Sequence, residues 1–402
     1  MQLAQVLTRT VVVYLGSRFC VGTAMMLLRA AIAWHVFDLT RSAFHLGLIG
    51  LVQFVPAFAL TLVAGALADT FDRRRIMMTA QTLTLAAGLA LAIATVRGTV
   101  TLGLLYAIVV AAAVATAFDS PARMAFLPSL VPRLAFPRVA TIASTNQALA
   151  FATGPAIGGL LIADLGIAAA YGAYVVLIAV ALVLLALLPS PPAAPSGRGV
   201  SLTVIREGVR FVRSRPVVLG CMTLDMFAVI FGGAAALLPV YATEILHVGP
   251  RGYGLLSSAL EVGALCTSLV LMVRPPIRHA GRALMAAVGA YGLATIVFGV
   301  SRSFPLSLAA YALVGVADQV SVVMRSTAIQ LSTPDELRGR VSAVNLLFIG
   351  ASNQLGAAES GFVAAATSAP FAVVSGGLAS LLVLAIVAWR IPELPRYRID
   401  RD

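Results

Sequence analysis

Long apolar stretches follow one another along almost the whole chain, with short connections between them. A membrane-spanning helix needs about 20 apolar residues. A hydropathy window of about 19 residues marks twelve candidate spans, near residues 11–36, 44–69, 76–97, 101–122, 138–163, 167–188, 217–243, 253–273, 282–300, 304–326, 340–367 and 370–390. Charged residues make up 11% of the 402 residues and the mean hydropathy is +0.97, whereas a soluble domain is about one quarter charged. The sequence therefore predicts an all-helical, multi-pass membrane protein.

The polar residues exclude several classes of enzyme. All 28 basic residues are Arg, because the sequence contains no Lys, and both a P-loop and a pyridoxal Schiff base require Lys. The four His have neither metal-ligand spacing nor a nucleophile beside them. We therefore expect no enzyme activity, no metal site and no cofactor.

The arginines predict how the chain lies in the membrane. With both termini on one side of an even number of spans, twenty Arg fall on that side and four on the other. The positive-inside rule then places both termini in the cytoplasm and the protein in the cytoplasmic (inner) membrane. Because these arginines lie between apolar stretches, the net charge of +12 indicates membrane orientation and not nucleic-acid binding.

The two halves of the sequence resemble each other. At an offset of 202 residues Arg123 matches Arg325, and Gly154 matches Gly356. Two six-helix halves related by a parallel repeat are typical of one transporter architecture. The expected domains are an N-terminal half, a cytoplasmic linker, a C-terminal half and a cytoplasmic tail, at residues 1–190, 191–215, 216–392 and 393–402.

The linker contains a short basic amphipathic segment. In SLTVIREGVRFVRSRP, residues 201–216, apolar side chains recur at helical spacing and arginines occupy another face. Such a helix is expected to lie on an anionic inner leaflet, and the alternative is a plain solvated linker.

The sequence GALADTFDRRR, residues 65–75, follows the second span. Gly65 allows two helices to approach closely. Asp69 is predicted at a helix C-terminus, where the macrodipole disfavours a carboxylate, so it needs a partner such as Arg73 or a helix N-terminus of the other half. We interpret Gly65, Asp69, Arg73 and Arg74 as a conformational latch, with a topology-fixing charge cluster as the alternative.

These residues, together with three further stretches, resemble the major facilitator superfamily. GALADTFDRRR is similar to the loop motif of that superfamily. FDSPARMAFLPSLVP (118–132), LLPVYATEIL (237–246) and MRSTAIQLSTPDELRGRVSAVN (324–345) resemble its enterobactin-exporter-like, multidrug efflux branch. The resemblance runs from Arg18 to about Gly377.

The resemblance implies the major facilitator fold, with twelve transmembrane helices in two six-helix halves. It also implies a monomer that exports siderophores, drugs or other amphipathic molecules. In the fifth span, GPAIGGLL combines small residues that favour close packing with a kinking proline and is similar to an antiporter motif, at Gly154, Pro155, Gly158 and Gly159. One departure is that the fourth span lacks the buried Arg of the common proton-translocation motif, and Arg123 lies at its end instead.

Ionisable residues within spans are the candidates for proton or substrate contacts, because a charge there costs a few kcal/mol unless it faces a cavity or a partner. They are Arg18, Arg29, Asp225, Glu261, Asp318 and Glu359. At an offset of 207 residues Arg18 matches Asp225, so these two could pair across the halves, whereas Arg29 has no obvious local partner and is our candidate for substrate contact. For every member the alternative is a structural ion pair. A separate charge cluster is predicted at helix ends, at Asp119, Arg123, Arg325, Asp335, Arg338 and Arg340.

The predicted function is secondary active export of a small amphipathic molecule by alternating access, with proton antiport as the energy source. Its expected partners are that molecule, protons and the lipid bilayer, without nucleic acid. Two alternatives share the fold, namely a lysophospholipid or lipid transporter and a proton-coupled importer. A non-transporting sensor is a third alternative, although no added soluble domain is present to pass on a signal.

Overall fold

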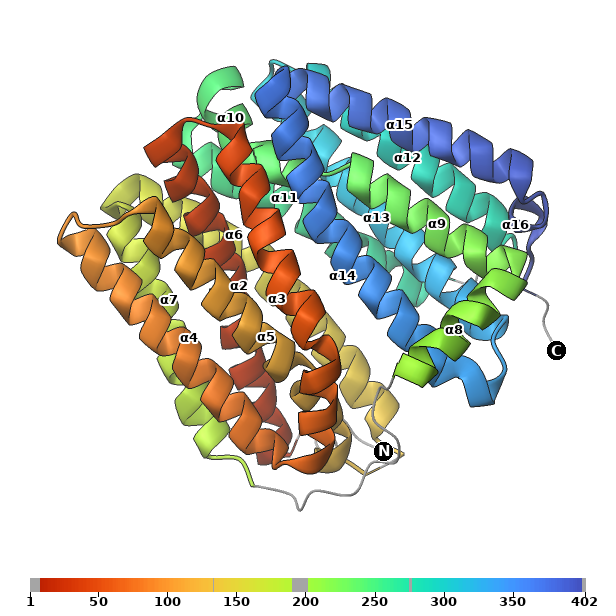
Figure 1. Ribbon diagram of the computed structural model, residues 1–402, viewed down its shortest axis with the longest axis horizontal. Helices are drawn as coiled ribbons and strands as arrows, with labels where there is room; N and C mark the ends of the chain where they lie inside the picture. The colour runs from red at the N-terminus through yellow and green to blue at the C-terminus, as the bar shows by residue number, and fades with distance from the viewer. Residues whose placement is uncertain (1–7, 133, 190–201, 275–276, 400–402) are drawn as a thin grey trace. The chain divides into compact units, whose positions relative to one another are not determined.

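The computed structural model describes residues 8–132, 134–189, 202–274 and 277–399, without the side chains of residues 61–70 and 202–205. In these ranges every regular element is a helix and no strand occurs (Figure 1). The chain divides into two compact units, which we call the N-half, residues 1–39 and 52–200, and the C-half, residues 40–51 and 201–402.

The N-half consists of long apolar helices with short connections. They are α2 (Arg9–Thr40), α3 (Ala43–Thr70, whose first residues group with the C-half), α4 (Arg73–Val96), α5 (Leu102–Leu130), α6 (Phe136–Leu165) and α7 (Ile167–Ala186). Side-chain caps begin two of them, because Asp72 accepts from the Arg74 amide at 2.9 Å and Thr101 from the Leu104 amide at 3.2 Å. Helix α4 packs against α5 and α7, and Phe126 is fully buried in the core of this half.

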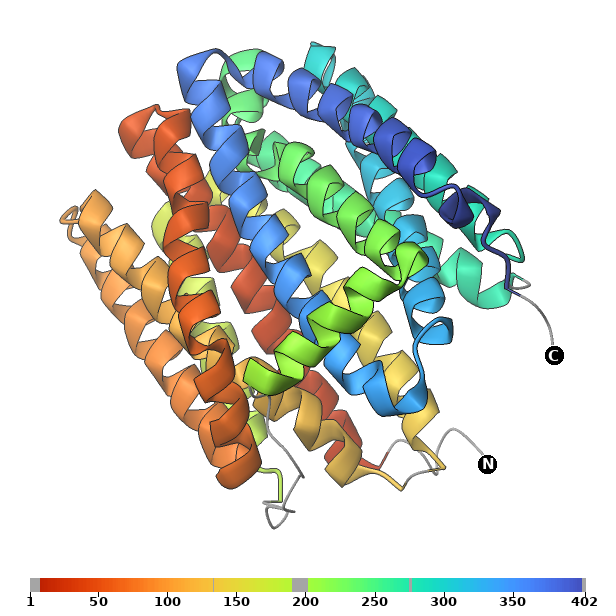
Figure 2. The ribbon, with the colours of Figure 1, turned by 45° about the vertical axis from the view of Figure 1, so that its right-hand side comes forward.

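The C-half begins with a short helix and continues with the remaining spans. Its elements are α8 (Leu202–Ser214), α9 (Pro216–Phe231), η1 (Ala234–Leu237), α10 (Leu238–Val240), η2 (Tyr241–Ile245), α11 (Gly249–Val273), α12 (Ala280–Val300), α13 (Phe304–Leu331), α14 (Asp335–Ala366), α15 (Ala369–Arg390) and α16 (Glu393–Arg396). Helix α12 packs against both α13 and α15, and Figures 1 and 2 show α12 beside α15.

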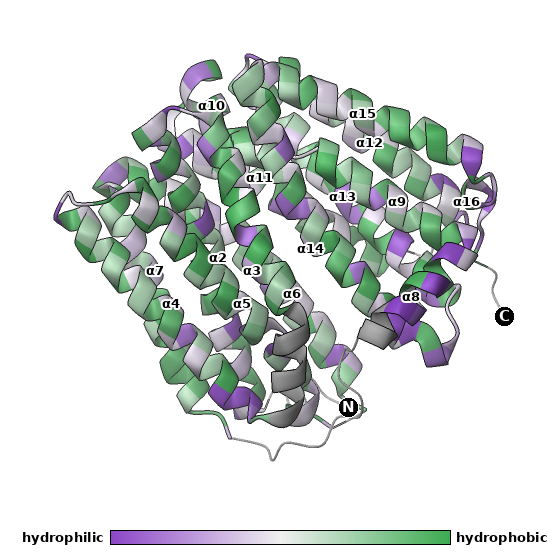
Figure 3. Cartoon of the chain, in the orientation of Figure 1, coloured by the Kyte–Doolittle hydropathy of each residue, from purple (hydrophilic) through white to green (hydrophobic). Residues whose placement is uncertain are grey.

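Eleven segments in the described ranges are long and apolar enough to cross a membrane. The twelfth predicted span, residues 340–367, lies in α14, which has 32 residues but a more polar composition than the others. The predicted span 217–243 is interrupted, because α9 ends at Phe231 and a 3-10 turn, a short α-turn and a π-turn follow Gly232 and Gly233. Hydropathic colouring shows the apolar character of the long helices and the polar character of α8 (Figure 3).

Helix α8 is amphipathic, and its buried face packs on α14 of the same half. A Cβ on Gly208 would lie 2.8 Å from the Arg340 carbonyl oxygen, and Val212 is 5% exposed. Glu207 and Arg340 form an ion pair at 3.1 Å. Arg206, Arg210 and Arg213 are all exposed. The rest of the predicted linker, residues 190–201, lies outside the described part of the chain.

Candidate functional site

Arg123 is the centre of a polar network inside the N-half. Its Nε and Nη2 atoms both donate to the Asp119 carboxylate at 2.8 Å, one helical turn away on α5. Gln81 of α4 donates to the same carboxylate at 3.5 Å, and the Tyr14 hydroxyl of α2 donates to the Arg123 carbonyl at 3.2 Å. The Arg123 and Asp119 side chains are 10% and 14% exposed. In a bidentate pair of this kind each charge compensates the other at a buried position where water cannot solvate them.

Arg18 of α2 lies next to this network but has no carboxylate partner among the described residues. Its Nη2 donates to Gln147 Oε1 of α6, and its side chain lies beside the Tyr14 hydroxyl. The Arg18 Nε is buried and has no hydrogen-bond partner within the described ranges. The neighbouring Asn146 donates to the Leu15 carbonyl at 3.0 Å and so joins α6 to α2. Arg18 therefore keeps its charge uncompensated by any carboxylate.

Arg29 lies three helical turns further along α2. Its side chain is exposed, and it forms no hydrogen bond or ion pair with the residues that the structure describes. The sequence singled out Arg29 as the candidate for substrate contact because it has no local partner. In the structure Arg29 is an accessible cation within a long apolar helix, and its contact with substrate stays a prediction.

In the C-half, Arg325 of α13 pairs with Asp225 of α9. The two side chains are 3% and 8% exposed, and Cys221 lies beside the guanidinium. This ion pair differs from the predicted one, in which Asp225 pairs with Arg18. The physical reason is that Arg325 is itself buried, and a buried cation that lost its carboxylate would be strongly destabilising.

Asp318 of α13 lies near the interruption between α9 and η1. It is half-buried and forms no hydrogen bond or ion pair with the described chain. The Tyr291 hydroxyl of α12 lies within electrostatic range of Asp318 and donates to the Gly232 carbonyl at 3.2 Å, where α9 ends. Interrupted helices of this kind form ion and substrate sites in many transporters.

The other two candidate carboxylates have different surroundings. Glu359 of α14 is half-buried and accepts a hydrogen bond from the adjacent Ser360 hydroxyl at 3.3 Å. Glu261 is half-buried near the middle of α11. The structure therefore distributes the C-half carboxylates over α9, α11, α13 and α14.

The predicted latch lies where α3 ends and α4 begins. Gly65 and Asp69 belong to α3, but the Asp69 side chain lies outside the described part of the chain. Arg73 donates to the Ala125 carbonyl of α5 at 3.1 Å. Arg74 donates to the carbonyls of Leu185, at 3.2 Å, and Ala186 at the end of α7. Both arginines thus bind backbone carbonyls within the N-half, and Arg74 satisfies carbonyls that a helix end leaves unpaired.

The predicted antiporter motif positions α6 on α2. A Cβ on Gly154 would lie 2.7 Å from the Met26 Cβ and 2.7 Å from the Thr23 carbonyl oxygen, so only glycine fits there. Gly158 is less constrained, because its nearest neighbour, Leu27, would be 3.5 Å away. Pro155 and Gly159 are both buried in the same helix.

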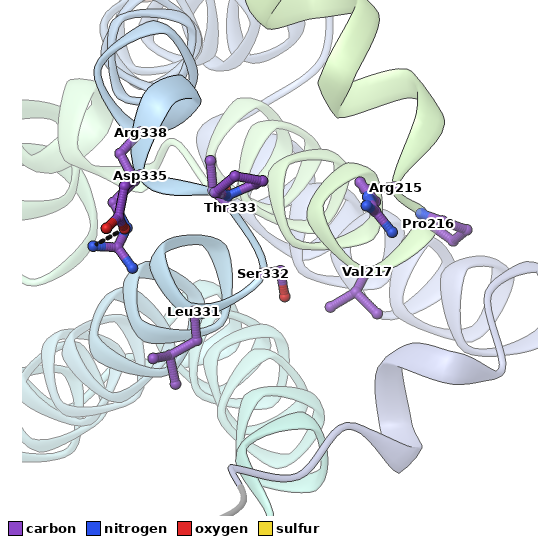
Figure 4. Close-up of a pocket in the computed structure, with 9 residues that line it drawn as sticks. Arg215, Pro216, Val217, Leu331, Ser332, Thr333, Asp335 and Arg338 are labelled. Atoms are coloured by element: carbon purple, nitrogen blue, oxygen red, sulfur yellow. Dashed lines mark ion pairs between the residues drawn. The ribbon is translucent and has the colours of Figure 1, made fainter.

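The predicted helix-end cluster consists of separate ion pairs. Besides the pairs of Arg123, Arg325 and Arg340, Asp335 pairs with Arg338 at 2.7 Å on one turn of α14. These two residues line a cavity of about 580 Å³ at the start of α9, the end of α13 and the start of α14 (Figure 4). Because this cavity lies at helix ends and not among the ionisable residues of the spans, we do not assign it to the transported molecule.

Sequence reasoning missed three polar side chains that complete these sites, namely Tyr14, Gln81 and Tyr291. A signal was present for Tyr14, because the offset of 207 residues that matches Arg18 to Asp225 also matches Tyr14 to Cys221. Tyr14 lies beside Arg123 in the N-half, and Cys221 lies beside Arg325, the matching arginine, in the C-half. Gln81 is a polar residue 3% exposed within a span, which by itself predicts a buried hydrogen-bond partner.

Comparison with known proteins decides the family. Residues 11–400 match the transmembrane secretion effectors, a family of the major facilitator superfamily. The chain belongs to this family. It is therefore a multi-pass membrane transporter and not an enzyme.

Curated relatives of this transporter include efflux proteins. The multidrug efflux pump Tap of Mycobacterium tuberculosis is 31% identical over 404 residues, with 92% of each chain covered. The enterobactin exporter EntS of Escherichia coli is 24% identical over 383 residues, with 95% of this chain and 92% of the relative covered.

Solved structures confirm the major facilitator fold. The nucleoside transporter NupG has a TM-score of 0.74 at 13% identity and covers 97% of this chain and 100% of its own. A bacterial homologue of the human lysosomal transporter Spinster has a TM-score of 0.73 at 14% identity, with 98% and 100% covered. At these identities the likeness concerns the fold alone.

Proposed function

We propose that this transporter exports a small amphipathic molecule by alternating access, in exchange for protons that enter the cell. The relatives Tap and EntS, an efflux pump and an exporter, support the direction and the kind of cargo. The proposal includes a monomer in the cytoplasmic membrane with both termini in the cytoplasm, as the arginine distribution predicts.

The observation that carries proton coupling is the environment of Asp318. A proton carrier must hold its proton in one conformation and release it in another, so it cannot be committed to a permanent cation. Asp225 is paired with Arg325 and Asp119 with Arg123. Asp318 has no such partner in the described chain and lies near the Tyr291 hydroxyl. We assign the proton to Asp318, with Glu359 and Glu261 as further carboxylates on the C-half.

The proposal includes the predicted latch, whose contacts would change between the two conformations of the transport cycle. Arg73 and Arg74 hydrogen-bond the start of α4 to α5 and α7. A change in the contacts of Asp69, at the end of α3, would therefore move the helices of the N-half together. Gly154 would let α6 and α2 move together, because no side chain separates their backbones.

Flux into sealed proteoliposomes tests this proposal. The purified full chain is reconstituted with an amphipathic dye, and a pH gradient is imposed so that protons leave the compartment in which the dye should accumulate. The wild type should concentrate the dye only when the gradient is present. Asp318→Asn should still exchange dye between compartments but should not concentrate it.

Two control variants accompany that experiment. Asp335→Asn changes a carboxylate that is 79% exposed at a helix end and should behave as the wild type. Glu261→Gln shows whether a second carboxylate is needed. Flux that ignores the pH gradient, with Asp318→Asn equal to wild type, would reject proton antiport.

A further inference from the structure

The spans of the N-half carry more positive than negative charge. Their ionisable residues away from the helix ends are Arg18, Arg29, Arg123 and Asp119, as far as the described side chains show. Asp119 is fully engaged with Arg123 through two bonds of 2.8 Å. Two guanidinium groups, both on α2, are therefore left without a carboxylate.

The exposure pattern of α2 shows that Arg29 does not face lipid. Arg29 is the one exposed residue of this helix between Val13 and Phe37. Its neighbours Leu28 and Ala30 are each 5% exposed, so protein encloses the helix on its other sides. A cation facing hydrocarbon costs several kcal/mol and is rare in membrane proteins. We therefore infer that the space that Arg29 reaches is filled with water and not with lipid.

Arg18 and Arg29 lie on the same side of α2. Eleven residues correspond to three turns with about 20° of rotation, and to about 16 Å along the helix axis. Met25 lies on the same side, about 20° from Arg18 around the helix, and Met26 flanks that side at about 80°. Both methionines are half-buried. Arg18 contributes a buried Nε that has no partner in the described chain. This face therefore combines unpaired cationic donors with flexible, polarisable methionine side chains that adapt to apolar groups of varied shape.

We propose that this arginine face of α2, defined by Arg18, Met25, Met26 and Arg29, binds the negatively charged group of the transported molecule. The substrate class is then an amphipathic organic anion that carries a carboxylate, sulfonate or phenolate. A guanidinium presents its donors in a planar fork that matches a carboxylate in two bonds. Arg29, being accessible, contacts the anion first, and the methionines contact its apolar part.

This inference rests on the proposed function, and it is consistent with the energetics of export. An inside-negative membrane potential favours outward movement of an anion. A negatively charged lysophospholipid presents the same chemistry at its head group, so the test must also separate a free organic anion from a lipid.

Equilibrium binding to the purified full chain tests the anion site independently of transport. The two probes are carboxyfluorescein, an anion, and rhodamine 123, a cation, which share the same xanthene ring system. Fluorescence polarisation should show that the wild type binds the anion at least tenfold more tightly. Arg29→Gln should weaken anion binding about tenfold or more, as expected for loss of a hydrogen bond to a charged group, and should leave cation binding unchanged. Arg29→Lys should retain part of the affinity, and Arg29→Glu should reverse the preference.

Arg29 is exposed and has no partner in the described part of the chain, so its variants should fold, and their thermal unfolding midpoints verify this. The matched control is Arg210→Gln on the exposed face of α8, which should bind both dyes as the wild type does. Equal binding of the two dyes, binding of neither dye, or an Arg29→Gln variant with wild-type affinity for the anion would overturn the inference. Displacement of bound dye by a short aryl carboxylate identifies a free organic anion, whereas displacement only by lysophosphatidylglycerol identifies a lipid.

Failure of this inference is distinguishable from failure of the proposed function. If Arg29-dependent anion binding is found but dye flux ignores the pH gradient, the anion site stands and proton antiport fails. If the wild type concentrates the anionic dye and Arg29→Gln does so equally well, export stands and the anion site fails.

Discussion

The N-half and the C-half contain the same repeated arginine but neutralise it in different ways. Arg123 takes its carboxylate, Asp119, from the same helix one turn away. Arg325 takes its carboxylate, Asp225, from α9, one hundred residues earlier in the chain. The two charges of the first pair belong to one helix, α5, whereas the second pair joins two spanning helices.

This difference leaves unlike charges at like positions. Arg18 on α2 matches Asp225 on α9 at an offset of 207 residues. Because Asp119 already neutralises Arg123, Arg18 remains a cation without a carboxylate. Because Asp225 is engaged with Arg325, Asp318 is left as a carboxylate without a cation in the described part of the chain. The repeat therefore preserves the fold, while the charged residues described away from the helix ends are mainly positive in the N-half and mainly negative in the C-half.

The largest effect is expected when the inter-helix pair is broken. Asp225→Ala leaves Arg325 buried without its carboxylate, which should cost about 3–5 kcal/mol of stability. A large drop in the thermal unfolding midpoint of the detergent-solubilised protein would show it. Replacing both residues together, with Asp225→Leu and Arg325→Leu, should recover most of the loss, because no unpaired charge remains. A single variant as stable as wild type would contradict the proposed importance of this pair.

Breaking the pair within α5 should cost less. Asp119→Asn removes the negative charge but keeps an oxygen that accepts from Arg123, so we expect a loss of about 1.5–3 kcal/mol. The same thermal measurement, made beside Asp225→Asn, compares the two halves directly. An equal or larger loss for Asp119→Asn would show that the N-half pair is also a tie between helices, through Gln81 and Tyr14.

The repeated glycines sharpen the comparison, because here the halves should respond alike. A Cβ at Gly154 would lie 2.7 Å from the Thr23 carbonyl oxygen, and a Cβ at Gly356 would lie 2.6 Å from the Val229 carbonyl oxygen. Alanine at either position should force the helices apart and cost about 1–3 kcal/mol. Gly158→Ala is the control, since its neighbour is 3.5 Å away. The thermal unfolding midpoint and the dye flux of each variant measure this effect. If Gly158→Ala were destabilised and Gly154→Ala were not, the close contact between α6 and α2 would lie at Gly158 and not at Gly154.

The smallest effect is expected where α8 meets α14. Glu207 and Arg340 are 45% and 32% exposed, and an ion pair of this kind contributes about 0–1 kcal/mol. Glu207→Gln should barely move the unfolding midpoint, and the small shift should shrink further at high salt. Gly208→Leu should do more, because the backbone of α14 occupies the space of that side chain. A salt-independent loss on Glu207→Gln would argue against this account of the contact.

The sequence predicted the fold well because the membrane imposes a simple constraint, namely helices of about 20 apolar residues. The interruption after Phe231 was not predicted, because Gly232 and Gly233 are compatible with a helix in an apolar window. A tertiary contact marks the end of α9. The Tyr291 hydroxyl occupies the space that a side chain at position 232 would need, and it donates a hydrogen bond to the Gly232 carbonyl.

The candidate charges were also predictable, since any ionisable residue in an apolar span is conspicuous. Their partners were not predictable, because sequence spacing reveals a pair such as Asp119 and Arg123 on one helix but not one such as Asp225 and Arg325 on two helices. The accessibility of Arg29 likewise depends on how neighbouring helices enclose α2. Thus the sequence predicted which charged residues lie within the spans, and the structure was needed to show which of them form ion pairs in the described part of the chain.

The central claim is that the N-half binds the transported molecule while Asp318 in the C-half holds the proton that it displaces. Proton release on substrate binding tests this most directly. Carboxyfluorescein is added to the purified protein in unbuffered detergent solution, and a pH electrode records released protons while fluorescence polarisation records binding. The account predicts that the wild type binds dye and releases protons and that Asp318→Asn binds dye without release. Arg29→Gln should bind dye and release protons only at dye concentrations about tenfold higher or more. Proton release by Asp318→Asn equal to that of the wild type would contradict it.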